Sequence, residues 1–133
     1  MKKILLVDDE AEIIDTLRDF LEDQGYECLS ARDGFEALSV LRETVVDVIV
    51  SDLRMPTVSG LELVRSMRDL GIKTPVIWLT GYANSDDFKA GWSNGLTECL
   101  EKPVNLEELK QSILTALALG PEFTTERRIG PKR

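Results

Sequence analysis

Short apolar runs alternate with segments of helical periodicity along most of the chain. The first run, residues 4–7, has no polar position, which is typical of a strand buried on both faces of a sheet. Segments with apolar residues every three or four positions predict helices, and a glycine follows four of them. The predicted strands span 4–7, 26–30, 45–50, 75–79 and 98–100, and the predicted helices span 11–24, 35–42, 60–70, 85–94 and 106–119.

The regular order of strand and helix predicts one α/β domain over residues 1–120. Repeated strand–helix units form a parallel sheet with helices on both faces, and right-handed crossovers make that sheet open and doubly wound. Residues 121–133 have no apolar period and are expected to be a linker or a disordered tail. Within the predicted helix 60–70, one stripe is expected to face the core, formed by Leu61, Val64, Met67 and Leu70.

The composition excludes several classes of mechanism. The 133 residues include no histidine, which rules out a Ser–His or Cys–His nucleophile pair and any metal site that needs an imidazole. The two cysteines, Cys28 and Cys99, are too few for a cysteine-only zinc site.

Charge is unevenly distributed along the chain, whose formal net charge is -8. Residues 1–120 hold 22 acidic and 12 basic side chains, whereas residues 121–133 hold two acidic and four basic ones. An acidic body repels phosphate backbones, so we expect no direct nucleic-acid binding by residues 1–120. No apolar run is long enough for a membrane span or a signal-peptide core, so we expect a cytoplasmic protein that does not bind membranes.

Polar side chains follow four of the five predicted strands at the point where each strand ends. Ligands of an open parallel sheet bind beyond the carboxyl ends of its strands, so these side chains are expected to meet at one edge. They are Asp8 and Asp9 after the first strand, Asp52 after the third, Thr80 after the fourth and Lys102 after the fifth.

This set of side chains favours phosphoryl chemistry. Three carboxylates without histidine or thiolate suit a hard cation, and Mg²⁺ is the expected one. Mg²⁺ keeps several waters and is often completed by phosphate oxygens. Asp52 is then a candidate nucleophile towards phosphorus, with Lys102 and Thr80 stabilising the phosphoryl charge, so the pattern predicts an aspartyl-phosphate.

Each of these residues also has a purely structural interpretation. Asp9 with Glu12 fits a helix capping box, and Asp8 can be a solvated loop residue. Asp52 can be an ordinary turn residue, Thr80 can simply end a strand, and Lys102 can be a solvated surface lysine. Their shared position at strand ends favours a common site.

Four pieces of sequence stand in a fixed order at these strand ends. They are Ile-Leu-Leu-Val-Asp-Asp-Glu at 4–10, Asp-Leu-Arg-Met-Pro at 52–56 with Gly-Leu-Glu-Leu at 60–63, Leu-Thr-Gly at 79–81 and Lys-Pro at 102–103. Over about residues 2–119 the chain resembles the receiver domain of bacterial two-component response regulators. The resemblance implies a flavodoxin-like fold with strand order 2-1-3-4-5, and a phosphoacceptor that assists its own phosphorylation and dephosphorylation without being an enzyme.

The resemblance also implies how the acidic residues act. Asp52 would accept a phosphoryl group from a histidine of a sensor histidine kinase or phosphotransfer protein, so the histidine that this chain lacks lies on the partner. Asp8 and Asp9 would hold Mg²⁺, with help from Asp52 and the main-chain carbonyl of Arg54.

The remaining implications concern the switch. Thr80 would turn towards the phosphoryl group and Lys102 would pair with it, and the bond from Lys102 to Pro103 is expected to be cis. The fourth helix, fifth strand and fifth helix would form the switching surface and a possible phosphorylation-dependent homodimer face. The cognate kinase, the downstream output and whether the chain is full-length are left open.

Three positions differ from the family pattern or invite another interpretation. Cys99 stands where the family usually has an aromatic residue, and it is too small to repeat the inward swing of that ring. Trp92 can carry a surface change instead or, as its structural interpretation, be a partly buried packing residue. Gly91 replaces the usual alanine at a cost of about 0.5–1 kcal/mol, so the fourth helix is expected to be the least stable. On the two edge strands, Cys28 and Cys99 would be about 19 Å apart, so no disulfide is expected.

Other functions compete with a phosphorylation-switched signalling domain. A haloacid-dehalogenase-type phosphatase needs a second acid two residues after the nucleophile, where this chain has Arg54. A flavin-binding electron carrier needs a phosphate loop after the first strand, where the acidic residues 8–10 repel phosphate. A phosphorylation-independent binding module with the receiver fold stays as the alternative, supported by Cys99.

Overall fold

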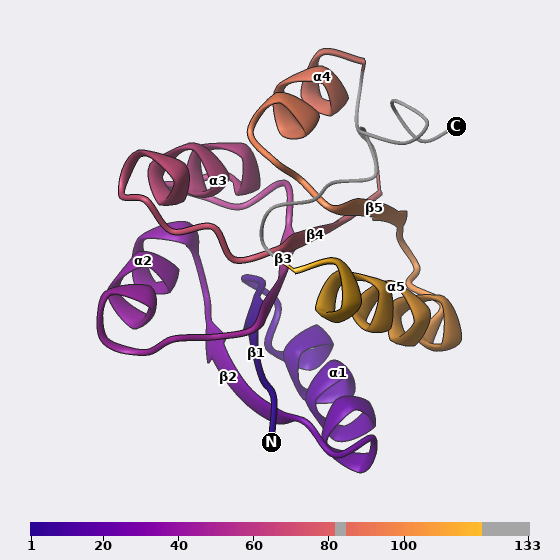
Figure 1. Ribbon diagram of the computed structural model, residues 1–133. Helices are drawn as coiled ribbons and strands as arrows, with labels where there is room; N and C mark the ends of the chain where they lie inside the picture. The colour runs from indigo at the N-terminus through magenta and orange to yellow at the C-terminus, as the bar shows by residue number, and fades with distance from the viewer. Residues whose placement is uncertain (82–84, 121–133) are drawn as a thin grey trace.

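The chain folds around a parallel sheet of five strands with helices on both sides, as Figure 1 shows. The computed structural model describes residues 1–81 and 85–120. The strands are β1 (Lys3–Val7), β2 (Glu27–Ala31), β3 (Val48–Asp52), β4 (Val76–Thr80) and β5 (Glu98–Glu101). The helices are α1 (Ala11–Asp23), α2 (Gly34–Glu43), α3 (Gly60–Asp69), α4 (Ser85–Ser93) and α5 (Leu106–Leu119).

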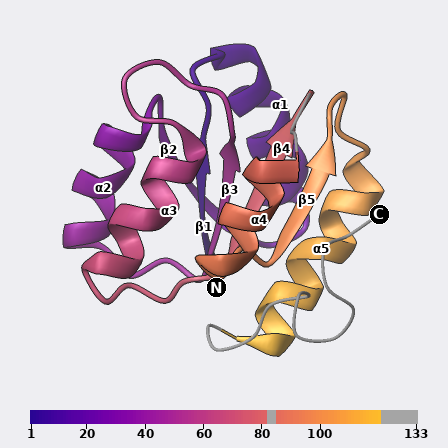
Figure 2. The same cartoon turned by 90° about the horizontal axis from the view of Figure 1, so that it is seen from above.

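The strand order is β2-β1-β3-β4-β5, and every neighbouring pair is parallel (Figure 2). The predicted doubly wound, flavodoxin-like fold is therefore confirmed. The order reverses between β1 and β3, and ligands of such sheets bind where the order reverses. Asp8 follows β1 and Asp52 ends β3, so the topology alone brings these two carboxylates to the same place.

Helices α1 and α5 cover one face of the sheet, and α2, α3 and α4 cover the other (Figure 1). Successive strand residues point to opposite faces, so each strand contributes to both cores. In β1, Ile4 and Leu6 join the core beside α1 and α5, whereas Leu5 and Val7 join the core beneath the other three helices. This two-sided burial explains why the run at 4–7 contains no polar residue.

Side-chain caps explain where three of the helices begin. Asp33, Ser59 and Asn105 each accept a hydrogen bond from the backbone N–H three residues later, at 2.8, 3.2 and 2.9 Å. These residues are the N-caps of α2, α3 and α5. Caps of this kind satisfy backbone donors that the first helical turn leaves unpaired.

β3 begins three residues later than the apolar pattern predicts. Val45 is 86% exposed, and the strand starts at Val48. Asp47 explains the boundary, because its carboxylate accepts a hydrogen bond from the Lys3 N–H at 2.8 Å. The polar residue within the run therefore ties the chain to the start of β1 instead of continuing the strand.

The buried side of α3 differs from the predicted stripe. Leu63, Val64 and Met67 are buried, whereas Leu70 is 53% exposed and Leu61 only packs against the edge of the core. The prediction was right for Val64 and Met67, right in part for Leu61, which is partly buried against this core, and wrong for Leu70. Leu70 is the C-cap of the helix, so the chain turns away before this side chain can reach the core.

Trp92 and Gly91 on α4 both serve packing. Trp92 is 1% exposed and belongs to the core beneath α2, α3 and α4, so it is a packing residue that lies deeper than the partly buried position predicted for it. A Cβ at position 91 would lie only 2.8 Å from two ring atoms of Trp78. The glycine therefore makes room for a neighbouring ring, which the sequence pattern did not reveal.

The two cysteines lie on opposite edges of the sheet. Cys28 on β2 is buried in the core beside α1 and α5, and Cys99 on β5 packs against the other core. Both are free thiols, as predicted. Burial raises the pKa of Cys28 to about 11 and that of Cys99 to about 12, so neither is a thiolate at neutral pH.

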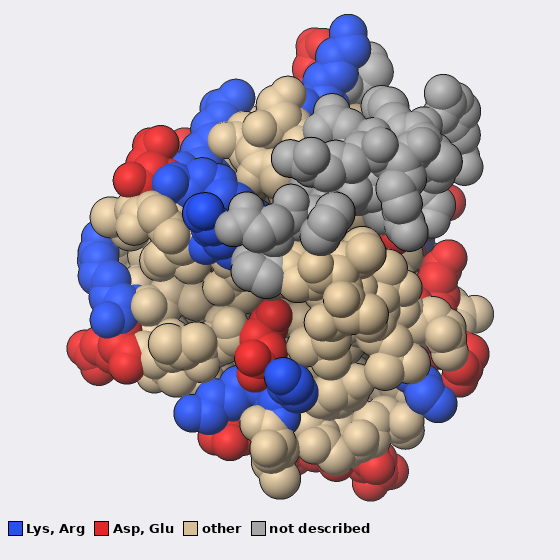
Figure 3. Space-filling model, in the orientation of Figure 1, with Lys and Arg blue, Asp and Glu red and all other residues tan. Residues whose placement is uncertain are grey.

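None of the described helices is long and apolar enough to cross a bilayer. On the face seen in Figure 3, acidic and basic side chains are interleaved rather than separated by sign. Residues 121–133, the predicted linker or tail, lie outside the described residues. The domain boundary at residue 120 and the lack of nucleic-acid binding stay predictions.

Candidate functional site

Four predicted side chains lie at the carboxyl edge of the sheet. Asp8, Asp52 and Thr80 are 2%, 6% and 3% exposed, and they stand at the ends of β1, β3 and β4. Lys102 follows β5, and its side chain is 21% exposed. Burying a charged side chain is unfavourable unless it has a partner, so the contacts among these four side chains show whether they form one site.

Lys102 joins the ends of three strands. Its ammonium Nζ lies 3.3 Å from Asp8 Oδ2 and 3.3 Å from Asp52 Oδ2. Its backbone N–H donates to the Thr80 carbonyl at 2.8 Å, and the bond to Pro103 is cis, as predicted. The interpretation of Lys102 as a solvated surface lysine is therefore wrong.

Each buried carboxylate is held at both of its oxygens. Asp8 Oδ1 accepts a hydrogen bond from the Glu10 N–H at 2.9 Å, and Asp52 Oδ1 accepts one from the Arg54 N–H at 3.3 Å. The second oxygen of each faces Lys102. Asp8 is thus not a solvated loop residue, and both carboxylates are held in place.

The electrostatics of the site leave an excess of negative charge. Burial raises the pKa of Asp52, repulsion from Asp8 raises it further, and Lys102 opposes both effects. Burial alone would lower the pKa of Lys102, but attraction to Asp52 and Asp8 outweighs burial, so this pKa is raised. One ammonium compensates two carboxylates, and a cation would complete the balance.

The acidic residues after β1 could hold such a cation. The carboxylate oxygens of Asp8, Asp9 and Glu10 lie within 4.8 Å of one another, with Asp8 buried and the other two exposed. All-oxygen donors of this kind fit Mg²⁺. Glu10 was not predicted as a member of the group, although its position next to Asp8 and Asp9 was the available signal.

The capping interpretation of Asp9 is wrong. The N-cap of α1 is Glu10, and no side chain caps this helix. Asp9 is therefore held by neither a cap nor the core, and its exposed carboxylate lies beside Asp8. The role of the Arg54 main-chain carbonyl stays a prediction.

The structure adds an ion pair near the site that sequence reasoning missed. Arg54, two residues after Asp52, contacts Asp87 in the first turn of α4 with Nη2–Oδ2 at 3.1 Å. The two residues are 33 positions apart, so no local pattern could pair them. Arg54 is 59% exposed, and exposed pairs contribute little stability.

Comparison with known proteins agrees with this geometry. Residues 4–114 match the response regulator receiver domain family. The chain is 38% identical over 110 residues to the sensor histidine kinase RcsC of Salmonella typhi, which covers 83% of this chain and 12% of that protein. It is 36% identical over 123 residues to the transcriptional regulatory protein CiaR of Streptococcus pneumoniae, which covers 92% of this chain and 54% of CiaR.

A solved structure shows the same fold. The chemotaxis response regulator CheY4 of Vibrio cholerae matches with a TM-score of 0.81 and 36% identity, over 88% of this chain and 99% of that one. The chain spans only part of RcsC and about half of CiaR, whereas it covers nearly all of CheY4. The family match, the sheet order and the acidic edge agree, and the chain therefore belongs to the response regulator receiver domain family.

Proposed function

We propose that this receiver domain is a phosphoacceptor of a two-component phosphorelay and that Asp52 takes the phosphoryl group. The observation that carries the proposal is the position of the Lys102 ammonium, 3.3 Å from both Asp52 and Asp8 at a buried sheet edge. A fixed positive charge beside a buried carboxylate stabilises negative charge that arrives there.

The proposed reaction is transfer from a phosphorylated histidine of a sensor histidine kinase or phosphotransfer protein. A carboxylate oxygen of Asp52 attacks phosphorus and forms the O–P bond, while the P–N bond breaks and its electron pair returns to the imidazole. Lys102 pairs with the transferred group, and the Thr80 hydroxyl donates a hydrogen bond to it. The chain assists its own phosphorylation and dephosphorylation and is not proposed to be an enzyme on other substrates.

Mg²⁺ is the proposed cofactor. When bound, it neutralises part of the charge on the phosphoryl oxygens. Asp8, Asp9, Asp52 and the main-chain carbonyl of Arg54 are the proposed ligands. The close carboxylate oxygens after β1 and the uncompensated charge of the site support this assignment.

Relatives that include a sensor kinase and a transcriptional regulator support a place in such a relay. The proposed place of action is the cytoplasm. The surface formed by α4, β5 and α5 is the proposed switching surface, and a phosphorylation-dependent homodimer there is part of the proposal. The downstream output stays unassigned.

The test is intact-mass spectrometry after incubation with Mg²⁺ and acetyl phosphate. We expect a single base-labile phosphoryl adduct that disappears when Mg²⁺ is omitted and in Asp52→Asn. Asp47→Asn is the matched control, because Asp47 precedes the same strand at its other end and should leave the adduct intact.

An adduct of equal yield in Asp52→Asn would refute the assignment of the acceptor. If acetyl phosphate gives no adduct, phosphorylated sensor kinases are tried next. Failure with these as well would favour the phosphorylation-independent binding module.

A further inference from the structure

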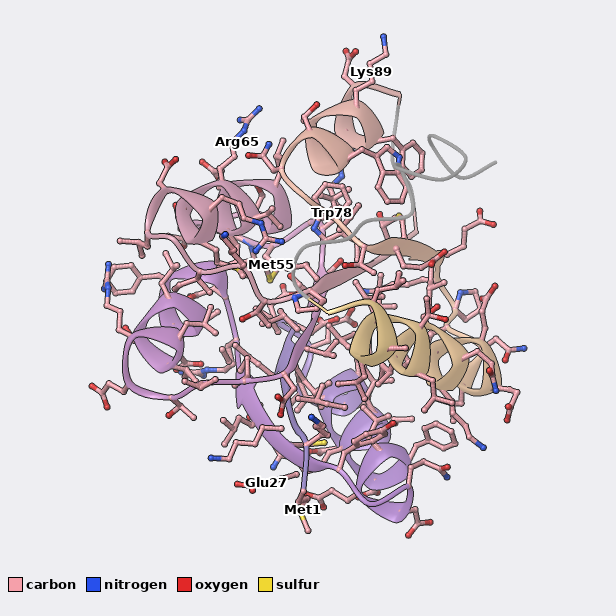
Figure 4. The ribbon with its side chains drawn as sticks, in the orientation of Figure 1. Met1, Glu27, Met55, Arg65, Trp78 and Lys89 are labelled. Atoms are coloured by element: carbon pink, nitrogen blue, oxygen red, sulfur yellow. The ribbon has the colours of Figure 1, made fainter. Side chains whose placement is uncertain are left out.

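Trp78 occupies a central place between the site and α4. It lies in β4 two residues before Thr80 and is completely buried. Figure 4 shows the labelled ring between α3 and α4. Its neighbour across the β4–β5 pair is the small Cys99, which adds little bulk on this side of the sheet.

One edge of the indole contacts the start of α3 close to Asp52. A Cβ at Gly60 would lie 3.2 Å from Trp78 Nε1 and 2.6 Å from the Asp52 carbonyl oxygen. The Gly60 N–H also donates to the Leu53 carbonyl at 2.8 Å. The indole N–H itself has no hydrogen-bond partner among the described residues, although buried donors are almost always paired.

The opposite edge of the indole contacts the last turn of α4, which contains Gly91. Two atoms of the six-membered ring, Cη2 and Cζ3, lie 2.8 Å from the place that a Gly91 Cβ would take. Only a glycine fits there without a shift of the ring or the helix. The indole therefore bridges the segment that leaves Asp52 and the last turn of α4.

Side chains from other segments contact both ends of α4. At its C-terminal end, Arg68 of α3 donates from Nε to the Asn94 carbonyl at 2.7 Å and from Nη2 to the Gly95 carbonyl at 3.2 Å. At its first turn, Asp87 is linked to the site through its exposed ion pair with Arg54.

We propose that the indole of Trp78 transmits a change at Asp52 to α4 through its contacts at Gly60 and Gly91. The proposal rests on the proposed function for its trigger, the phosphorylation of Asp52. An unpaired buried N–H in one state is expected to find an acceptor after a small shift of the ring, which gives the indole a second favourable position. Because the ring fills the space beneath Gly91, such a shift moves α4.

The test compares the full chain with Trp78→Phe, whose single ring cannot reach both glycines. Each protein is treated with Mg²⁺ and acetyl phosphate, intact-mass spectrometry measures the adduct, and hydrogen–deuterium exchange measures α4. We expect an equal adduct in both proteins and a change in α4 exchange only with Trp78. Trp92→Phe, which alters the other buried tryptophan of the same core, is the matched control and should keep the response.

An unchanged α4 response in Trp78→Phe at equal adduct overturns the proposal. If Trp78→Phe does not fold, Gly91→Ala tests the same contact, and an α4 response equal to that of the unsubstituted chain overturns the proposal.

A chain that gains no adduct from acetyl phosphate or from phosphorylated sensor kinases contradicts the proposed function, and the inference is then tested by Asp52→Asn without a phosphodonor. This substitution should change α4 exchange in the chain that keeps Trp78 and leave it unchanged in the Trp78→Phe background. No change, or equal changes in both backgrounds, overturns the inference.

Discussion

Asp52 is a residue whose ionisation lowers the stability of the folded state. Its pKa is raised above the ordinary value of 3.8 by burial first and then by Asp8, despite the opposing Lys102. An acid with a raised pKa in the folded state favours folding in its neutral form. That contribution is fully present below the unfolded pKa and is lost as pH rises through the folded pKa.

Replacing Asp52 by Asn should therefore stabilise the protein at pH 7 without Mg²⁺. We expect the melting temperature to rise by a few degrees, because one ammonium then faces one carboxylate. The gain should shrink as pH falls below the folded pKa of Asp52 and vanish below the unfolded one. Circular dichroism melts from about pH 3 to about pH 7 measure both effects, because this range runs from below to above the ordinary pKa of a carboxyl.

Asp47→Asn is the control at the same strand, and it should not stabilise, because the Asp47 carboxylate accepts the Lys3 N–H. Added Mg²⁺ should stabilise the unsubstituted chain more than Asp52→Asn. A lower melting temperature for Asp52→Asn at pH 7 would contradict this account of the site.

At the scale of elements, Arg68 ties α3 to two other segments. Its guanidinium donates to the carbonyls of Asn94 and Gly95 at the end of α4 and to those of Ile72 and Thr74 before β4. Burial lowers the pKa of Arg68, yet the group stays charged at neutral pH. One side chain thus satisfies several carbonyls that a helix end and a loop leave without partners.

Arg68→Ala should lower the free energy of unfolding by about 2–4 kcal/mol, because four partly buried carbonyl acceptors lose their donor. Arg65→Ala is the matched control on the same helix, since Arg65 is exposed and points away from the domain (Figure 4). Urea unfolding measures both variants. A loss in Arg68→Ala no larger than that in Arg65→Ala would count against the role of these hydrogen bonds.

The contact between β4 and α4 predicts that Gly91→Ala changes the free energy of unfolding in opposite directions in two backgrounds. Gly91→Ala alone should destabilise, because the new methyl would lie 2.8 Å from the Trp78 ring. In a Trp78→Leu background the same change should stabilise by about 0.5–1 kcal/mol, the usual helix preference for alanine over glycine. A double-mutant cycle by urea unfolding tests this, and the same sign in both backgrounds would contradict it.

These elements also show what the sequence could predict. The type and order of all ten elements followed from the pattern of apolar, polar and glycine residues. The meeting of four candidate site residues at one edge followed because a parallel sheet gathers its strand ends there. Periodicity did not locate the start of β3, because the side chain of Asp47 bonds to another strand. It also did not reveal the fit of Trp78 to Gly91, because side-chain packing between distant segments leaves no local pattern.

At the scale of the whole molecule, one sheet joins two separate cores. Trp78 and Trp92 both lie in the core beneath α2, α3 and α4, whereas Cys28 lies in the core beside α1 and α5. Every strand contributes to the sheet between them, so loss of one core exposes the other. The described fold should therefore unfold in one cooperative step.

Two probes can follow the two cores independently. In a Cys99→Ser variant, tryptophan fluorescence reports one core and reaction of Cys28 with a thiol reagent reports the other. We expect the same urea midpoint from both probes, and little reaction before unfolding, because burial raises the pKa of the thiol to about 11. Labelling of Cys28 at clearly lower urea would show that the core beside α1 and α5 opens separately.

The close fit of Trp78 to Gly91 has a consequence for hybrid proteins. The Trp78 ring and the glycine that leaves room for it come from different segments of the chain, so each depends on the other for its packing. If α4 is replaced by that of another receiver domain, a larger residue at position 91 would clash with Trp78 of the native β4. A graft of β4 alone, with a smaller residue at position 78, would leave a void. Exchange of segments between receiver domains should therefore treat 76–93 as one block.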